Sequence, residues 1–477
     1  MQLGREFVSM RKNNYTAQIS VSNQPIGDAS VNVEYLGVDN PRLDAIRLSA
    51  SDLVSAMFEN SGSAQHCDCV WPLMDAIWPA RSTNAYRHFP RDPITLTLVP
   101  LSRIGQMEGK SGSLVLIGSF RDNQNLDMPT SHPIVVKTAP ISAGKLKPEY
   151  DNALSIRPFT YQHKDVFSIP FRRDEKGGFD VLWSLFSASD PLWSLDSDAT
   201  LDPSLLKVRD LRDLLDDNKL RKAKLSLADT RETVSQILKT TYSTMRNLHI
   251  PFGRKLSRKV KVLEEYDWYL RGYPTVWGKE WESVFGQFTC ASTRFAGKDW
   301  ANPVWLIDQL KDLVCSFTFG AIHGDLHSGN VVITSDNQPR IIDFGWAKEE
   351  SHIAKDFVLM ECNLRFLFLR PQLASEDIDR LASWIQNGVP IPDDLSPYSK
   401  DHCSLILVLQ SLAREALGEE VDWNREYLLP LFLVAFGLLR FAPQLGNQQA
   451  AILTVLALAT HIKDCGILNR AEGVNAT

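Results

Sequence analysis

Residues 322–347 read IHGDLHSGNVVITSDNQPRIIDFGWA and contain two short apolar runs, each next to a polar cluster. The runs Val331–Ile333 and Arg340–Ile342 are rich in β-branched residues, which is typical of strands. The polar segment between them is long enough to connect two antiparallel strands. The loop before the first strand and the loop after the second then lie at the same end of the hairpin. The sequence therefore predicts a hairpin that brings the two polar clusters together.

The two polar clusters supply two acids and one amide. Asp325 and Asn330 come from the first cluster, and Asp343 comes from the second. Carboxylate and carbonyl oxygens, together with phosphate oxygens, are the ligands that Mg²⁺ prefers. Asn330 and Asp343 are therefore the predicted metal ligands, which leaves Asp325 as the catalytic base that accepts a proton. In kinase phosphoryl transfer an asparagine and two aspartates divide the work in this way.

The clusters also resemble a known signature. HGDLHSGN at residues 323–330, followed by IDFG at residues 342–345, is similar to the catalytic motif of the aminoglycoside phosphotransferase and choline kinase-like branch of the protein kinase-like superfamily. An isolated HGD or DFG is a weak signal, whereas the ordered pair flanked by apolar runs is a strong one. The resemblance implies a bilobal fold with a small antiparallel-sheet N-lobe and a larger helical C-lobe. It also implies ATP and Mg²⁺ as cofactors.

The resemblance makes a demand upstream of the motif. It implies a lysine on the third strand of the small lobe that holds the α- and β-phosphates, and a glutamate on the next helix that pairs with this lysine. Lys137 and Glu149 stand at suitable positions and are the predicted cofactor-binding pair. Taken singly, each residue has an ordinary explanation as well: Lys137 as a lysine that faces solvent from a strand, and Glu149 as an exposed charge on a helix. Lys145 and Lys147 compete with Lys137, but both lie past the strand.

A glycine-rich segment at residues 104–113 lies between the first two predicted strands of the small lobe. It lacks the complete GxGxxG order of a phosphate-covering loop. Gly109 and Gly112 are its predicted cofactor-binding residues, because glycine lets backbone N–H groups approach a phosphate closely. A hairpin turn without a ligand explains the same residues equally well.

The chain divides into three predicted regions of an α+β protein. Residues 1–92 form an N-terminal extension of unknown role, with a strand near Val31–Tyr35 and a helix near Ser51–Glu59. Residues 93–186 form the N-lobe, and residues 187–477 form the C-lobe with a helical insertion. The predicted strands of the N-lobe cover residues 94–99, 113–117, 133–137 and 181–186. Beyond residue 200 most segments have helical patterns, including residues 227–248 and 378–386.

The composition limits the class of protein. The chain has 477 residues, of which 44% are hydrophobic and 23% charged, so it contains enough apolar material for domains with buried cores. Its net charge of −6 gives no general basic field, and we predict neither nucleic acid nor a membrane as a partner. Seven scattered cysteines and an N-terminus without a signal-peptide pattern favour a reducing, cytoplasmic location.

One apolar segment has the composition of a membrane span but not the length. Residues Tyr427–Phe441 are interrupted by Pro430 and Arg440, and they are fewer than the roughly 20 residues that a bilayer requires. A buried helix is predicted instead, with the apolar segment Ala450–Ala459 as its antiparallel partner.

Three further features have ordinary explanations. The CxC in His66–Cys69 lacks the spacing of a zinc site, and an unligated segment is favoured. His323 is expected to fix the backbone of the catalytic loop rather than to transfer protons. The basic run Arg254–Lys261 is typical of a solvated helix face, with attraction of an acidic or phosphorylated substrate as the alternative.

The sequence says least about the substrate. Between residues 186 and 323 lies the stretch that would include the helical substrate-binding insertion of the family that the chain resembles. Its aromatic residues either line a pocket or form a core; they are Tyr266, Trp268, Tyr269, Trp277 and Trp281.

Two classes of function stay open. The first is an ATP-dependent phosphotransferase that moves the γ-phosphate to a hydroxyl of a small molecule or a protein, and the retained polar residues favour it. The second is a catalytically weak kinase-like scaffold or nucleotide-sensing module, which the irregular glycine segment favours. A protein partner bound through the N-terminal extension, within a multi-component defence or signalling system, belongs to this second class.

Overall fold

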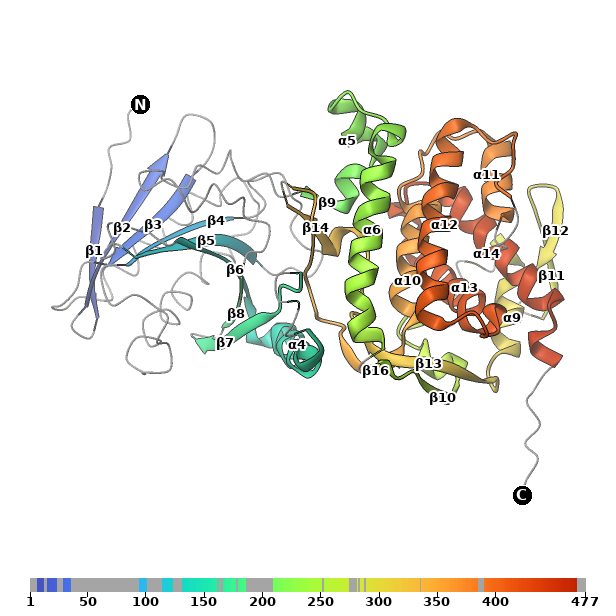
Figure 1. The fold of residues 1–477 in the computed structure, drawn as a ribbon, viewed down its shortest axis with the longest axis horizontal. Coiled ribbons are helices and arrows are strands. Elements are labelled where there is room, and N and C mark those ends of the chain that lie inside the picture. Colours follow the sequence, from blue (N-terminus) through green and yellow to red (C-terminus); the bar gives the residue numbers. More distant parts are fainter. Residues whose placement is uncertain are drawn as a thin grey trace, which may run out of the picture.

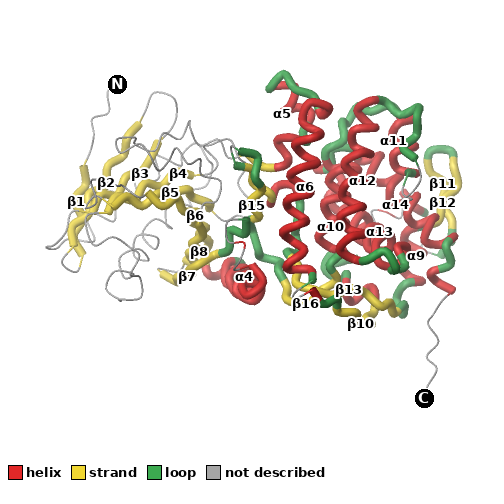
Figure 2. Tube along the Cα trace, in the orientation of Figure 1, coloured by secondary structure: helices red, strands yellow, loops and turns green. Residues whose placement is uncertain are grey.

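The computed structural model describes residues 7–12, 15–23, 29–35, 94–100 and 114–122 and, with short gaps, residues 131–185 and 209–469. Strands dominate its N-terminal part and helices its C-terminal part (Figure 1), as the colouring by secondary structure in Figure 2 also shows. The described chain is therefore a mixed fold of helices and antiparallel sheets, as the α+β prediction requires.

The N-terminal strands form one antiparallel sheet in the order β1-β2-β3-β4-β5-β6-β8-β7. The predicted boundary at residue 92 falls inside this sheet, because Val31 of β3 pairs with Leu98 of β4. The helix predicted near Ser51–Glu59 lies outside the described residues. The strands are β1 (Phe7–Lys12), β2 (Tyr15–Asn23), β3 (Ala29–Tyr35), β4 (Ile94–Pro100), β5 (Leu114–Asp122), β6 (Ser131–Pro140), β7 (Pro170–Lys176) and β8 (Phe179–Leu185).

Helix α4 (Leu146–Thr160) follows β6 and carries Glu149 in its first turn. Its buried residues Glu149, Ala153 and Ile156 are spaced four and three positions apart and so share one helical face. Lys137 lies in the middle of β6, paired with Val115 on one side and Leu182 on the other. The predicted order of strand, lysine and glutamate-bearing helix is therefore present.

The C-terminal part is built around buried helices. The helices are α5 (Asp217–Lys222), α6 (Leu227–His249), α7 (Val262–Glu265), α9 (Pro303–Gln309), α10 (Ala354–Cys362), α11 (Ser375–Ser383), α12 (Pro397–Leu417), α13 (Leu429–Leu438) and α14 (Gln448–Asp464). Its strands are β9 (Arg209–Asp210), β10 (Leu256–Lys261), β11 (Ser292–Phe295), β12 (Lys298–Ala301), β13 (Val314–Ile322), β14 (Val331–Ile333), β15 (Pro339–Ile341) and β16 (Lys348–His352).

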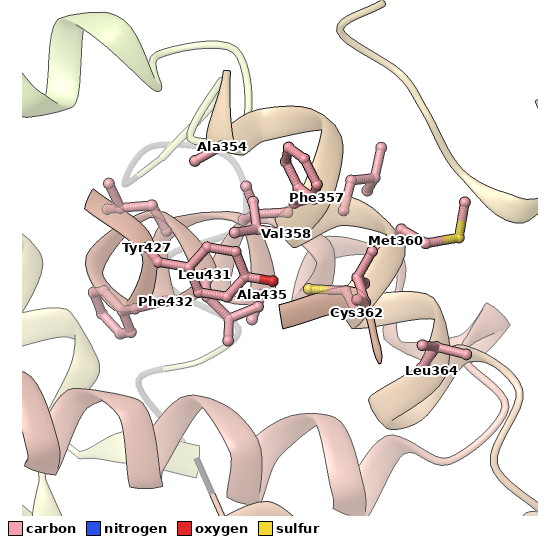
Figure 3. Packing of buried hydrophobic residues seen from close by; sticks show 14 of the residues in the cluster. Ala354, Phe357, Val358, Met360, Cys362, Leu364, Tyr427, Leu431, Phe432 and Ala435 are labelled. Atoms are coloured by element: carbon pink, nitrogen blue, oxygen red, sulfur yellow. The ribbon is translucent and has the colours of Figure 1, made fainter. Parts of the chain in front are cut away.

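Helix α13 lies at the centre of this core and is buried over nearly its whole length. It packs against α10 and α14, and Figure 3 shows side chains of α10, such as Phe357, gathered with Leu431 and Phe432 of α13. The prediction of a buried helix with the following apolar segment as its neighbour is thus confirmed. Among the described helices, none combines the length and the apolar character needed to cross a bilayer.

A buried polar cluster joins three helical segments in the same core. The Glu361 carboxylate accepts hydrogen bonds from Arg365 Nε at 2.6 Å, Gln410 Nε2 at 2.9 Å and the Tyr427 hydroxyl at 2.6 Å. Arg365 is fully buried and also donates to the carbonyl oxygen of Trp384 at 3.1 Å. Such a cluster stabilises the packing only while every member is present, because a lone buried charge is costly.

The helical pattern predicted beyond residue 200 was partly wrong. The basic run Arg254–Lys261 largely coincides with strand β10, not with a helix, and β10 pairs with β13, which in turn pairs with β16. All residues of β13 except Val314 and Ser316 are buried, so most of the strand shows no alternation of exposed and buried side chains. A strand of this kind cannot be distinguished from a buried helix by its periodicity.

Candidate active site

The predicted hairpin is present and positions the two polar clusters. Strands β14 and β15 are antiparallel, with Val331 opposite Ile341. A short 3₁₀ turn, Ser328–Asn330, leads into β14, and the N–H of Ile342 donates to the carbonyl oxygen of Asn330 at 3.0 Å. Asn330 is thereby held beside the residue that precedes Asp343.

Lys137 connects the large sheet to this hairpin. Its Nζ lies 2.6 Å from Glu149 Oε1 and 3.3 Å from Asp343 Oδ1. The side chains of Lys137 and Glu149 are only 20% and 11% exposed. Neither is therefore an ordinary charge that faces solvent, which was the alternative explanation. The competing Lys147 is exposed and pairs with Asp151 on its own helix.

The charges of these three residues depend on one another. Burial disfavours the charged form of Lys137, but Asp343 and Glu149 outweigh burial and raise the pKa of the lysine. Burial raises the pKa of Glu149 above its ordinary value, although Lys137 opposes that shift. Burial acts on Asp343 too, yet the neighbouring Lys137 lowers the pKa of Asp343 below its ordinary value. At neutral pH the site therefore contains an ionised Asp343 beside a firmly charged lysine.

His323 fixes the backbone of the loop that precedes the hairpin. Its Nε2 lies 2.8 Å from the carbonyl oxygen of Ile342, and its Nδ1 accepts the N–H of Asp325 at 3.3 Å. One ring nitrogen therefore donates and the other accepts, which requires the neutral imidazole. Burial of the ring lowers the pKa of His323 and favours that form. These contacts confirm the backbone-fixing role expected for His323.

Asp356 of α10 anchors the same loop, and no sequence pattern singled it out. Its Oδ2 accepts the N–H of His323 at 3.0 Å, and its Oδ1 accepts the N–H of Gly324 at 2.8 Å. His249, at the end of α6, contributes its Nε2 to Asp356 Oδ2 at 3.0 Å. The side chain of Asp356 is fully buried. The segment Ala354–Cys362 reads AKDFVLMEC and carries a second acid, Glu361, so an acid near buried apolar residues is only a weak sequence signal for Asp356.

Two residues of the site have a left-handed backbone. Gly324 has a φ of 82°, and a Cβ there would lie 2.2 Å from the carbonyl oxygen of Trp346. Asp343 has a φ of 66°, a conformation that costs a non-glycine residue about 1 kcal/mol or more. The next residue, Phe344, is fully buried and packs against His323 with ring centroids 4.8 Å apart. That anchor holds Asp343 in the strained conformation.

Asp325 is partly buried, and 28% of its side chain is exposed. Burial raises its pKa to about 7, and the negative charges of Asp343 and Asp356 contribute further. Asn330 Nδ2 donates to the carbonyl oxygen of Asp325 at 2.8 Å, which fixes the orientation of the amide. The Asp325 backbone is thus joined to Asn330, and its carboxylate lies within the electrostatic influence of Asp343.

The donor set suits a cation that is bound mainly by phosphate and water. Asn330 uses its Nδ2 for Asp325, so its Oδ1 is available to a cation. Lys137 contacts Oδ1 of Asp343, so Oδ2 is available as well. Among the described residues, no group of three or more His, Cys, Asp or Glu side chains could hold a metal alone. Mg²⁺ ordinarily takes only one or two protein ligands beside substrate phosphates, so Asn330 and Asp343 fit it.

Several predicted site residues cannot be placed. Gly109, Gly112 and the segment His66–Cys69 lie outside the described residues. Of the aromatic residues in the expected insertion, Tyr266, Tyr269 and Trp281 are buried and Trp268 is partly buried. Trp277 also lies outside the described part of the chain. A contact missed from the sequence joins α4 to the motif, because Asn152 Nδ2 donates to the carbonyl oxygen of Gly345 at 2.6 Å.

Comparisons with known proteins give a match to a family model over part of the chain and a similarity to a solved structure. A family model described as Ternary complex associated domain 9 matches residues 207–439. The chain is also similar to a solved structure from Haemophilus somnus 129PT to which fructosamine-3-kinase activity is ascribed, with 11% identity and a TM-score of 0.35. That similarity covers 75% of this chain and 90% of the other. No curated protein matches the chain. The solved structure is too distant to carry an argument, so the function is argued from the residues of the site.

Proposed function

We propose that the protein is an ATP-dependent phosphotransferase that moves the γ-phosphate of ATP to a hydroxyl of a small molecule or a protein. The observation that carries the proposal is the ammonium of Lys137, held between Glu149 at 2.6 Å and Asp343 at 3.3 Å. A buried lysine shared by two acids is what a site for a triphosphate and a metal requires. In this proposal residues 93–186 are the N-lobe and residues 187–477 the C-lobe of a kinase-like fold.

The residues have separate roles toward the nucleotide. Lys137, oriented by Glu149, binds the α- and β-phosphates, and the glycine-rich segment with Gly109 and Gly112 covers them. Asn330 and Asp343 hold Mg²⁺. When bound, Mg²⁺ neutralises phosphate charge and aligns the triphosphate for transfer. The lowered pKa of Asp343 keeps this ligand ionised before any cation arrives.

Asp325 acts on the acceptor. It orients the hydroxyl, and as the oxygen bonds to the γ-phosphorus, the hydroxyl proton passes to the Asp325 carboxylate. The bond between the γ-phosphorus and the β,γ-bridging oxygen breaks, and ADP departs with that oxygen. Asp356 fixes the backbone just before Asp325, and the His323 ring accepts the N–H of Asp325 itself. The position of Asp325 is therefore set before the substrates bind.

Transfer of radiolabel from [γ-³²P]ATP tests the proposal directly. Purified protein is incubated with Mg²⁺ and a panel of hydroxylated small molecules and proteins, with Asp325→Ala as the control. We expect labelling of at least one acceptor class by the wild type, dependent on Mg²⁺, and loss of that labelling in the variant. A wild type that binds no ATP, or that labels acceptors no faster than the variant, would refute the phosphotransferase.

A second function is supported by the family match. The family is described as a ternary complex associated domain, and we infer from this description a nucleotide-sensing scaffold within a multi-protein complex as the alternative. In that case a partner protein would bind to the N-terminal strands β1 to β3. ATP binding with turnover equal to that of Asp325→Ala, together with nucleotide-dependent association of a partner, would favour the scaffold. A cytoplasmic location is part of both proposals.

A further inference from the structure

A cluster of aromatic side chains, Trp268, Tyr269 and Trp346, lies beside the catalytic loop. Trp346 follows the DFG segment, and 43% of its surface is exposed, which is unusual for a tryptophan next to a core. Its ring centroid lies 4.7 Å from that of Trp268, with an interplanar angle of 56°. Tyr269 meets Trp268 edge-on at 5.0 Å. An exposed tryptophan held in place by a second one provides a rigid apolar face.

The cluster contacts Gly324, the residue just before the proposed catalytic base Asp325. A Cβ on Gly324 would lie 2.2 Å from the carbonyl oxygen of Trp346, so the two backbones are in contact. The Tyr269 hydroxyl donates to the carbonyl oxygen of Gly324 at 3.4 Å. The cluster therefore lies on the part of the loop that presents Asp325, the residue that acts on the acceptor.

Arg440 adds a positive charge to the same place. Its guanidinium carbon lies 5.1 Å from the centroid of the Trp268 ring. Its Nε is buried and has no hydrogen-bond partner. Among the described residues, no carboxylate contributes to the shift in its pKa. Burial lowers the pKa of Arg440, and the neighbouring positive charge of Arg271 lowers it further. A half-buried guanidinium that no described acid neutralises favours an anionic ligand.

The close packing of α13 brings Arg440 to this position. A Cβ on Gly437 would lie 2.5 Å from the carbonyl oxygen of Tyr269, so only glycine permits this approach. Arg440 lies three residues beyond Gly437, in the 3₁₀ segment Leu439–Gln444 that follows α13. Burial raises the pKa of the Tyr269 hydroxyl, the charge of Asp325 raises it further and the charge of Arg440 lowers it, so both charges lie near this hydroxyl.

We propose that Trp268, Trp346 and Arg440 form the acceptor subsite, and that the acceptor is a hydroxyl compound with an apolar or aromatic face and an anionic group. This inference rests on the proposed function. The tryptophans contact the flat face of the acceptor, and the guanidinium binds its carboxylate or phosphate through charge-assisted hydrogen bonds. A cationic acceptor is disfavoured, because it would meet Arg440 with the same sign of charge.

Three probes of similar size and different charge test the inference. Phenyllactate, phenylpropanediol and phenylalaninol each carry a phenyl ring and a hydroxyl, with an anionic, a neutral and a cationic substituent in turn. Their binding to the full chain is followed by tryptophan fluorescence, and their phosphorylation by transfer from [γ-³²P]ATP. The variants are Arg440→Gln and Arg440→Lys. The matched control is Arg414→Gln, because Arg414 lies 4.3 Å over Trp423 in a similar contact away from the motif.

We expect phenyllactate to bind about tenfold more tightly than phenylpropanediol, and phenylalaninol to bind most weakly. Arg440→Gln should remove the preference for the anion, Arg440→Lys should retain part of it, and Arg414→Gln should leave it unchanged.

Equal affinity for the three probes, a preference for the cation, or no binding at millimolar concentration would overturn the inference. An acceptor found to be phosphorylated without regard to its charge would also overturn it, while the proposed function would stand. Anion binding that depends on Arg440 in a protein that transfers no phosphate would support the anion site and refute the proposed function.

Discussion

The carboxylate of Asp356 accepts the backbone N–H of His323 at 3.0 Å and thereby fixes the loop that carries Asp325. The same carboxylate accepts the N–H of Gly324 and contacts His249. One side chain of α10 therefore joins the end of α6 to the residues just before Asp325.

Asp356→Ala should destabilise the protein by about 3 kcal/mol, because it leaves two buried backbone N–H groups without an acceptor. Urea denaturation of the full chain measures the change in the free energy of unfolding. The control is Asp379→Ala, which removes a surface pair with Lys298 and should cost less than about 1 kcal/mol. Equal losses in the two variants would show that Asp356 does not anchor the loop.

Arg365→Leu should be among the most destabilising changes in the helical part. It leaves the buried Glu361 carboxylate without its charged partner, at a cost of about 3–5 kcal/mol. Replacing Glu361 by leucine in the same chain should recover much of that loss, since no uncompensated charge then remains. Arg258→Ala is the matched control, because its pair with Glu350 is half exposed. If the double variant is as unstable as the single one, the buried charge is not the cause.

His402 should make the stability depend on pH. Burial lowers its pKa from 6.5 to about 4, and Arg370 lowers it further, while Asp217 and the nearby Leu364 backbone oppose the shift. Between these two values the unfolded chain binds a proton that the folded chain does not, so stability is full above pH 6.5 and falls as the pH falls toward 4. The expected loss is about 3 kcal/mol.

His402→Leu cannot bind this proton, so its stability should change less over the same pH range. Urea denaturation of the wild type and the variant at several pH values gives the difference between the two profiles. Parallel profiles would mean that His402 is not the titrating group.

Lys137→Ala and Asp343→Ala should each abolish most of the rise in melting temperature that Mg²⁺-ATP gives the wild type. A ligand that binds only the folded state stabilises it by mass action, and each variant removes a group that the proposed function assigns to phosphate or metal. Lys147→Ala is the control, because this lysine is exposed and pairs with Asp151. A full shift in either site variant would remove that residue from the nucleotide site.

The sequence predicted those parts of the site that are encoded in local order. Asn330 and Asp343 flank two apolar runs that can form a hairpin, and Lys137 and Glu149 lie on a strand and the next helix. Their contacts follow from element order and chain direction. Asp356 could not be predicted, because its role depends on α10 packing under a loop that precedes it by some thirty positions in the sequence.

The fold was predictable where the patterns are periodic. The strands β4, β5, β6 and β8 and the helix α6 lie close to the residues predicted for them. Strand β13 was missed, because burial of most of its residues removes the alternation that identifies strands. The pairing of β3 with β4 joins residues separated by a long intervening segment, and no local pattern encodes such a contact.

The ATP turnover of Asp325→Asn tests the account most directly. The substitution keeps the shape of the side chain but removes the charge that attracts the hydroxyl proton, and such a base contributes typically about 10²–10⁴-fold. The loose transition state of phosphoryl transfer lowers that contribution, so we expect a decrease of at least about tenfold in phosphate transfer. Binding of Mg²⁺-ATP, measured by the shift in melting temperature, should stay close to that of the wild type. Equal transfer rates for the two proteins, with ATP bound to both, would contradict the account.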